Sequence, residues 1–146
     1  MHFFALLILT LALHASTAQA EPAVAGFIKT VEGNGLVVRG EESWPARIGD
    51  ILHVSDAVTT EKHSTVGIML EDDTLLSLGP ESRLELQDFA FAPQEEKLGV
   101  AIRLLKGSFA YMSGVIARLA PDKVRIETPD AVIAVHGTRL LVKVEE

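Results

Sequence analysis

The chain of 146 residues contains no cysteine. It therefore has room for a single domain, and disulfides, thiolate metal sites, a cysteine nucleophile and a lipid-modified cysteine anchor are excluded. Its formal net charge of -7 disfavours a nucleic acid or an anionic lipid surface as a partner. Apolar residues make up 48% of the chain and charged residues 23%, as in ordinary globular proteins. Because only 5% of residues are aromatic, Val, Leu and Ile must build the core.

The N-terminus has the features of a secretory signal. Residues 3–13 form an apolar run that is too short to span a bilayer comfortably. Small residues at Ala18 and Ala20 fit a cleavage site before Glu21. We predict a cleaved signal peptide at residues 1–20, with an uncleaved anchor as the alternative. This predicts a periplasmic or secreted protein, and export without disulfides favours a bacterial periplasm.

The mature chain opens with two expected strands, residues 27–31 and 36–39. The Asn34-Gly35 pair between them supplies the positive φ of a tight turn, so we expect a hairpin. Residues 40–45 read as a loop that contains Trp44. That side chain is either a ligand platform or a lid over the edge of the core, and the lid is the commoner use.

A third strand is expected over residues 48–54, with Gly49-Asp50 at its start. Asp after Gly commonly closes a turn with its own backbone, which we prefer to a charged ligand contact. Residues 66–86 then repeat alternating apolar pairs between turn residues, which predicts short strands. The turn Glu71-Asp72-Asp73 could suggest calcium, but a calcium loop spreads its oxygen ligands over about twelve residues. We predict a solvated turn.

Residues 87–99 contain Pro93 and several acids, and we expect a long surface loop. Residues 100–105 and 109–112 are expected to form a hairpin across Gly107. Residues 114–121 read as either a helical turn or a loop, and residues 124–128 as a strand.

The last stretch, residues 126–144, is the longest aliphatic segment of the mature chain. Before Gly137 it is apolar on both faces, so we expect that part at the centre of the fold. After Gly137 the apolar residues change phase, which predicts a bulge at Gly137-Thr138 that keeps one apolar face on the core.

The sequence contains no recognisable catalytic or metal-binding pattern. The histidines of the mature chain are His53, His63 and His136, and no serine motif or metal spacing accompanies them. We therefore predict a protein that is not an enzyme and needs no cofactor.

The C-terminal stretch resembles the hallmark of the FecR domain, a pattern of Thr-Pro, Ala and Val followed by Arg-Gly-Thr. The resemblance extends over residues 27–144. The residues that match are Gly49, Asp50, Thr59, Asp73, Thr74, Leu78, Gly79, Pro80, Ser82, Leu105, Gly107, Thr128, Pro129, Ala131, Val135, Gly137, Thr138 and Val142. His136 stands where the family usually has Arg. It is either a pH-responsive contact or, as we prefer, a partly buried imidazole bonded to a strand carbonyl.

We predict an all-β domain over residues 21–146, with short antiparallel strands in two packed layers, sandwich-like or a β-roll, and no substantial helix. The resemblance implies a periplasmic interaction module, and its transducer form links an outer-membrane receptor to a cytoplasmic sigma factor. We expect a protein partner in envelope signalling or assembly, bound at a strand edge for which residues 36–39 are the candidate. The alternative is a carbohydrate- or envelope-polymer-binding module that uses Trp44 and Tyr111. It requires the fold to bring these aromatic residues together.

Overall fold

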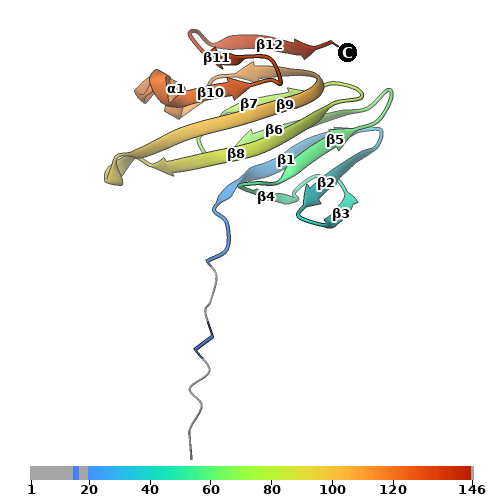
Figure 1. Ribbon diagram of the computed structural model, residues 1–146, viewed down its shortest axis with the longest axis horizontal. Coiled ribbons are helices and arrows are strands. Elements are labelled where there is room, and N and C mark those ends of the chain that lie inside the picture. Colours follow the sequence, from blue (N-terminus) through green and yellow to red (C-terminus); the bar gives the residue numbers. More distant parts are fainter. Residues whose placement is uncertain (1–14, 17–19, 146) are drawn as a thin grey trace, which may run out of the picture.

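The computed structural model describes residues 15–16 and 20–145 of the chain. The predicted signal peptide, residues 1–20, falls almost entirely outside these residues and stays a prediction. From Val24 onward the chain is a succession of strands (Figure 1). The elements are β1 (Val24–Glu32), β2 (Gly35–Arg39), β3 (Glu42–Pro45), β4 (Ile51–His53), β5 (Ala57–Thr60), β6 (Thr65–Leu70), β7 (Leu75–Leu78), β8 (Arg83–Ala92), η1 (Pro93–Glu95), β9 (Lys97–Met112), α1 (Val115–Leu119), η2 (Pro121–Lys123), β10 (Val124–Glu127), β11 (Val132–Ala134) and β12 (Arg139–Val144).

The strands form one hydrogen-bonded system that curls around a core. Its main path is β3-β2-β5-β8-β9-β7-β6-β1-β4 in a 12-stranded sheet, with β10 and β12 also paired to β9 and β11 paired to β10. We call β4, β1, β6, β7, β12 and the end of β9 sheet A, and β3, β2, β5, β8, β10, β11 and the start of β9 sheet B. The all-β prediction is confirmed. The layers are the two halves of one curled sheet.

Strand β9 belongs to both halves. Its 16 residues pair with β8 from Lys97 to Lys106, and with β12 from Gly107 to Met112. The predicted hairpin across Gly107 is therefore wrong, because the chain bends there without reversing. The predicted loop at residues 87–99 is also wrong, since β8 and β9 continue through it to a tip at η1. Pro93 interrupts the strand structure only at this tip, between the end of β8 and the start of β9.

The first two strands do not pair with each other. β1 pairs with β4 and β6 in sheet A, whereas β2 pairs with β3 and β5 in sheet B. The predicted hairpin is wrong because Ile28 and Val37, both fully buried, pack in different halves. The true hairpin joins β2 to β3, so residues 40–45 hold a strand as well as a turn. β2 is an interior strand and not the exposed edge that we predicted.

The C-terminal stretch also divides between the halves. Within the part of the chain that the structure describes, β11 pairs only with β10 in sheet B, and Val132 is 68% exposed. The expectation that this segment lies at the centre is wrong. Gly137, with φ 116°, lies where the chain leaves sheet B for β12 in sheet A. The change of apolar phase comes from this crossing and not from a bulge within one strand.

The segment left open as helix or loop contains helix α1. Together with η2 it carries the chain from the end of β9 back to β10, which consequently runs parallel to β9, in contrast to the other pairs. α1 has 5 residues, so the prediction of no substantial helix is confirmed. Among the described residues, the largest fully buried side chains are Tyr111 and Phe109 together with Leu and Ile residues.

Candidate functional site

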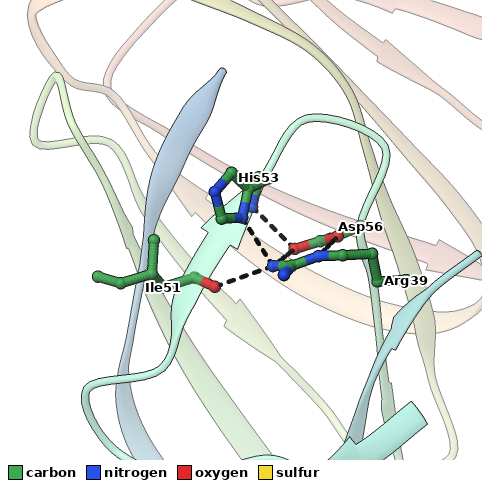
Figure 2. A network of polar contacts seen from close by, with 4 residues as sticks. All are labelled: Arg39, Ile51, His53 and Asp56. Atoms are coloured by element: carbon green, nitrogen blue, oxygen red, sulfur yellow. Dashed lines mark hydrogen bonds and ion pairs between the residues drawn. The ribbon is translucent and has the colours of Figure 1, made fainter. Parts of the chain in front are cut away.

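Arg39 at the end of β2 is the centre of a polar network (Figure 2). Its Nε and Nη2 donate to the Asp56 carboxylate at 2.9 and 2.8 Å, a two-pronged ion pair. Nη2 also lies 2.7 Å from His53 Nδ1 and 3.3 Å from the Ile51 carbonyl. Because a guanidinium has no acceptor, His53 Nδ1 must be the acceptor. The network therefore ties β2 to the β4–β5 turn.

Asp56 is held from several directions. It is 1% exposed, and its Oδ2 also accepts the backbone N–H of His53 at 2.8 Å. The hydrogen bond to Asp56 raises the pKa of Arg39 above its ordinary value. A cavity of about 350 Å³ adjoins the network and is lined in part by Glu21, Arg39 and His53. Ser55 also lines the cavity, but among the described residues no hydrogen bond joins its hydroxyl to His53, and the Arg39 guanidinium is already bound to Asp56.

Sequence reasoning missed the Arg39–Asp56 pair. The residues lie 17 positions apart in unrelated segments, and only the strand pairing brings them together. The single local hint is a charged residue directly before the apolar strand β5.

The two aromatic residues of the carbohydrate alternative are not brought together. Trp44 lies in β3, at the edge of sheet B, partly buried against the core and with the Arg39 guanidinium 5.1 Å from its ring centroid. Tyr111 is only 2% exposed and points into the core from β9. A buried Tyr111 presents no stacking face to a sugar, so this platform does not form.

The acidic turn between β6 and β7 is structural. Asp72 is 1% exposed, and its carboxylate accepts the N–H groups of Thr74 at 3.1 Å and Ile116 at 3.0 Å. It therefore caps helix α1 from a distant part of the chain. The prediction of a solvated turn is wrong for Asp72, although Asp73 is exposed.

A second group of the residues that match the FecR pattern meets at the bend of β9. Ser82 Oγ accepts the backbone N–H of Ser108 at 2.9 Å and donates to the Pro80 carbonyl at 2.9 Å. The backbone N–H of Gly79 donates to the Ser108 carbonyl at 2.9 Å. A Cβ atom on Gly107 would lie 2.6 Å from Ser82 Cα. These residues join the β7–β8 turn to the point where β9 passes between the sheets.

Two further sets of the residues that match the FecR pattern form turns. The Asp50 carboxylate accepts the Arg47 backbone N–H at 2.9 Å, which is the turn-closing role that we preferred. The turn at Thr128, Pro129 and Ala131 is closed by the Thr128 N–H on the Ala131 carbonyl at 2.9 Å. Both hydrogen bonds fix the local conformation of the backbone.

His136 is exposed at the crossing between the sheets. The preferred interpretation of a partly buried, carbonyl-bonded imidazole is therefore wrong. Its neighbour Thr138 has a backbone role, since its carbonyl accepts the Ser113 N–H at 2.9 Å. This bond starts the pairing of β12 with β9.

Strand β12 offers a free edge. Among the described residues it pairs only with β9. In an antiparallel strand the N–H and C=O of one residue point to the same side, and successive residues alternate. The Thr138 bond directs even-numbered residues toward β9, so the backbone groups of Arg139, Leu141 and Lys143 point to the free side. The site is thus a strand edge with unpaired main-chain groups.

Within residues 15–16 and 20–145, no cluster of His, Asp and Glu side chains is arranged to hold a metal ion. The helices of that part of the chain are also too short and too polar to cross a bilayer.

Comparison with known proteins identifies the family to which the chain belongs. A family model described as FecR protein matches residues 56–146. The chain belongs to the FecR family. Curated proteins and solved structures provide no match. FecR is a regulatory signalling family.

The FecR match begins at Asp56, at the start of β5. Gly49 and Asp50 therefore lie outside the matched residues, although the resemblance included them. In the structure the segment before Asp56 is not separate, because β1 pairs with β6 and β2 pairs with β5. The Arg39–Asp56 ion pair joins the two parts.

Proposed function

We propose that this FecR chain is a non-enzymatic interaction module of the cell envelope that binds a protein partner by strand addition at the free edge of β12. The observation that carries the proposal is the outward direction of the Arg139, Leu141 and Lys143 backbone groups. A partner strand would satisfy these groups and continue sheet A.

The chemistry of this edge suits a reversible contact. Leu141 is 75% exposed and supplies an apolar contact, while the Arg139 and Lys143 side chains flank it. Charged side chains on an edge strand oppose indiscriminate pairing with other sheets. The edge is therefore open to a partner whose side chains complement these cations.

Proline at position 143 tests the edge directly. Lys143→Pro removes an N–H that points to the free side and leaves the bonds to β9 in place. Lys143→Ala is the matched control, since it removes the charge and keeps the N–H. Calorimetric titration against signalling domains of outer-membrane receptors should show binding by the wild type and by Lys143→Ala, and none by Lys143→Pro.

The same titration separates the protein partner from the carbohydrate alternative. Peptidoglycan fragments serve as the second titrant. Heat with the glycans alone would contradict the proposal, as would equal binding by Lys143→Pro and the wild type.

Envelope location is part of the proposal. The apolar run at residues 3–13 and the small residues before Glu21 support export followed by cleavage. Intact-mass measurement of the native protein from a fractionated cell should give a chain that begins at Glu21. A full-length chain in the membrane fraction would support the uncleaved anchor instead.

A further inference from the structure

The outer face of sheet A carries a continuous apolar row. The strand registers place side chains directly opposite one another across β4, β1, β6, β7 and β9, and the row is Ile51, Phe27, Met69, Leu75 and Met112. Their chain neighbours Leu52, Ile28, Ile68, Leu76 and Tyr111 are buried in the core. The row, which we call the outer row, therefore points away from the core. Ile51 is 50% exposed, Phe27 38% and Met112 40%.

A shallow hollow adjoins the outer row. The next register positions are Ser77, Ala110 and Leu141. Ser77 and Ala110 are small and form the floor, while Leu75, Met112 and Leu141 border a volume of about 470 Å³. This is space for one bulky apolar side chain.

Sheet B follows the opposite pattern on its outer face. There the register aligns Glu85, Arg103 and Glu127, and Arg103 and Glu127 form an ion pair at 3.1 Å. A sheet with one solvated face normally alternates apolar inside and polar outside. Strands β8, β9 and β10 of sheet B obey this rule, whereas sheet A exposes neighbouring apolar side chains of the kind that marks a contact surface.

Two exposed cations lie beside the outer row, whereas the acids nearest to it, Asp50 and Asp73, lie in turns at its margins. Arg139 lies opposite Met112 and extends the row onto β12, and Lys29 is exposed at the register shift of β1. Neither residue forms an ion pair within the part of the chain that the structure describes. The outer row and the floor contain no acid, although the whole chain has a net charge of -7. The face therefore complements an anionic partner.

The backbone of this face limits the form of its occupant. Strands β1, β6, β7 and β9 have a partner on each side, so a segment that lies on them finds no free main-chain groups. It must satisfy its own backbone, which a helix does within itself. The row crosses five neighbouring strands, β4 to β9, and thus about 19 Å, which matches a helix of roughly 13 residues.

We propose that the outer row and its hollow dock an amphipathic helix of a protein partner, with a bulky apolar side chain in the hollow and acidic residues beside Arg139 and Lys29. A second copy of this chain fits less well, because it would oppose like cations on a face without acids. An anionic membrane would be repelled by the net charge of -7. The docking surface shares the Leu141 and Arg139 side chains with the β12 edge, but it does not use the free main-chain groups of β12.

Two synthetic peptides of about 18 residues test the proposal. One has Leu and Phe on one helical face and Glu on the other, and the second has Lys in place of every Glu. The mature wild-type chain should bind the acidic peptide at least about tenfold more tightly than the basic one, by fluorescence anisotropy. Amide chemical-shift changes should map to β6, β7 and β9.

Ala110→Glu places a like charge and a larger side chain in the hollow, and it should weaken binding of the acidic peptide about tenfold. Ala134→Glu is the matched control on exposed β11 and should leave binding unchanged. Lys143→Pro should also leave it unchanged, which separates this surface from the β12 edge. Equal affinity for both peptides, or no binding of the acidic one, would overturn the proposal. So would binding only to phosphatidylglycerol vesicles, or dimerisation that Ala110→Glu abolishes.

Discussion

The backbone N–H of Ile116 donates to the Asp72 carboxylate across 44 positions of sequence, at 3.0 Å. Asp72 also accepts the Thr74 N–H, and its own backbone carbonyl accepts the Val115 N–H at 2.8 Å. The first turn of α1 thus depends on an acid in the β6–β7 turn. An N-capping side chain normally comes from the residue that precedes the helix, where this chain has Gly114.

Asp72→Asn should destabilise the fold, because an amide N–H group would then face one of the N–H donors. We expect a loss of about 2 kcal/mol in the free energy of unfolding, measured by urea denaturation. Asp73→Asn is the matched control, since Asp73 is exposed with φ 68° and Asn tolerates that conformation. Equal losses for both variants would contradict the capping role.

Tyr111 predicts a loss of stability at alkaline pH. Burial, with a smaller contribution from Asp72, raises the pKa of Tyr111 to about 12. The unfolded chain releases this proton near pH 10, so the folded state binds more protons than the unfolded state between about pH 10 and 12. The free energy of unfolding contributed by this group should therefore be intact below pH 10 and fall as the pH rises toward 12, by about 2 kcal/mol in all.

Tyr111→Phe should remove that pH dependence. The Tyr111 hydroxyl is buried without a hydrogen-bond partner in the described structure, so its loss should cost little at neutral pH or stabilise the fold slightly. Urea denaturation at pH 7 and pH 11 measures both effects. A large loss at pH 7 would show that the hydroxyl has a partner after all.

Gly107→Ala should be among the most damaging small substitutions. The residue has φ 84°, and an added Cβ would lie 2.6 Å from Ser82 Cα, a backbone atom that cannot move aside. We expect a loss of about 3 kcal/mol or failure to fold. Gly99→Ala, in the same strand, meets nothing within 4 Å and should be nearly neutral by thermal denaturation.

Gly137→Val should cost about 2 kcal/mol through backbone strain alone. At φ 116° no L residue is comfortable, yet an added Cβ meets no atom within 4 Å. Gly137→Ala should therefore lose nearly as much as Gly137→Val, because both have the same strain and neither has a clash. A melting temperature unchanged by Gly137→Val would contradict the left-handed conformation.

Arg39→Lys should destabilise the chain even though it keeps the charge. A lysine ammonium cannot make both bonds to Asp56, which is 1% exposed and would keep an incompletely satisfied carboxylate. We expect a loss of about 1–2 kcal/mol in urea denaturation. Arg47→Lys, at an exposed position, is the control.

The sequence by itself determined the composition of the core, the strand character of most of the chain and the family. Alternation with a period of two is a local property, so the apolar pairs of β6, β7 and β8 were readable without a structure. The Gly49-Asp50 turn was equally local, because its hydrogen bond joins residues three positions apart.

Only the tertiary structure decided which strands pair and which apolar residues stay outside. The bend between β1 and β2 is at Gly33, with φ 75°, and Gly35 already belongs to β2. A local turn signal does not specify whether the next strand returns to the same half of the sheet. The apolar residues of β11 predicted a central strand. In the described structure β11 is an edge strand, because it pairs with β10 on one side and with no strand on the other. The sequence of no single strand predicts the outer row. Phe27, Met69, Leu75 and Met112 become one surface only through the registers of four strands, and register depends on burying the opposite faces of those strands together.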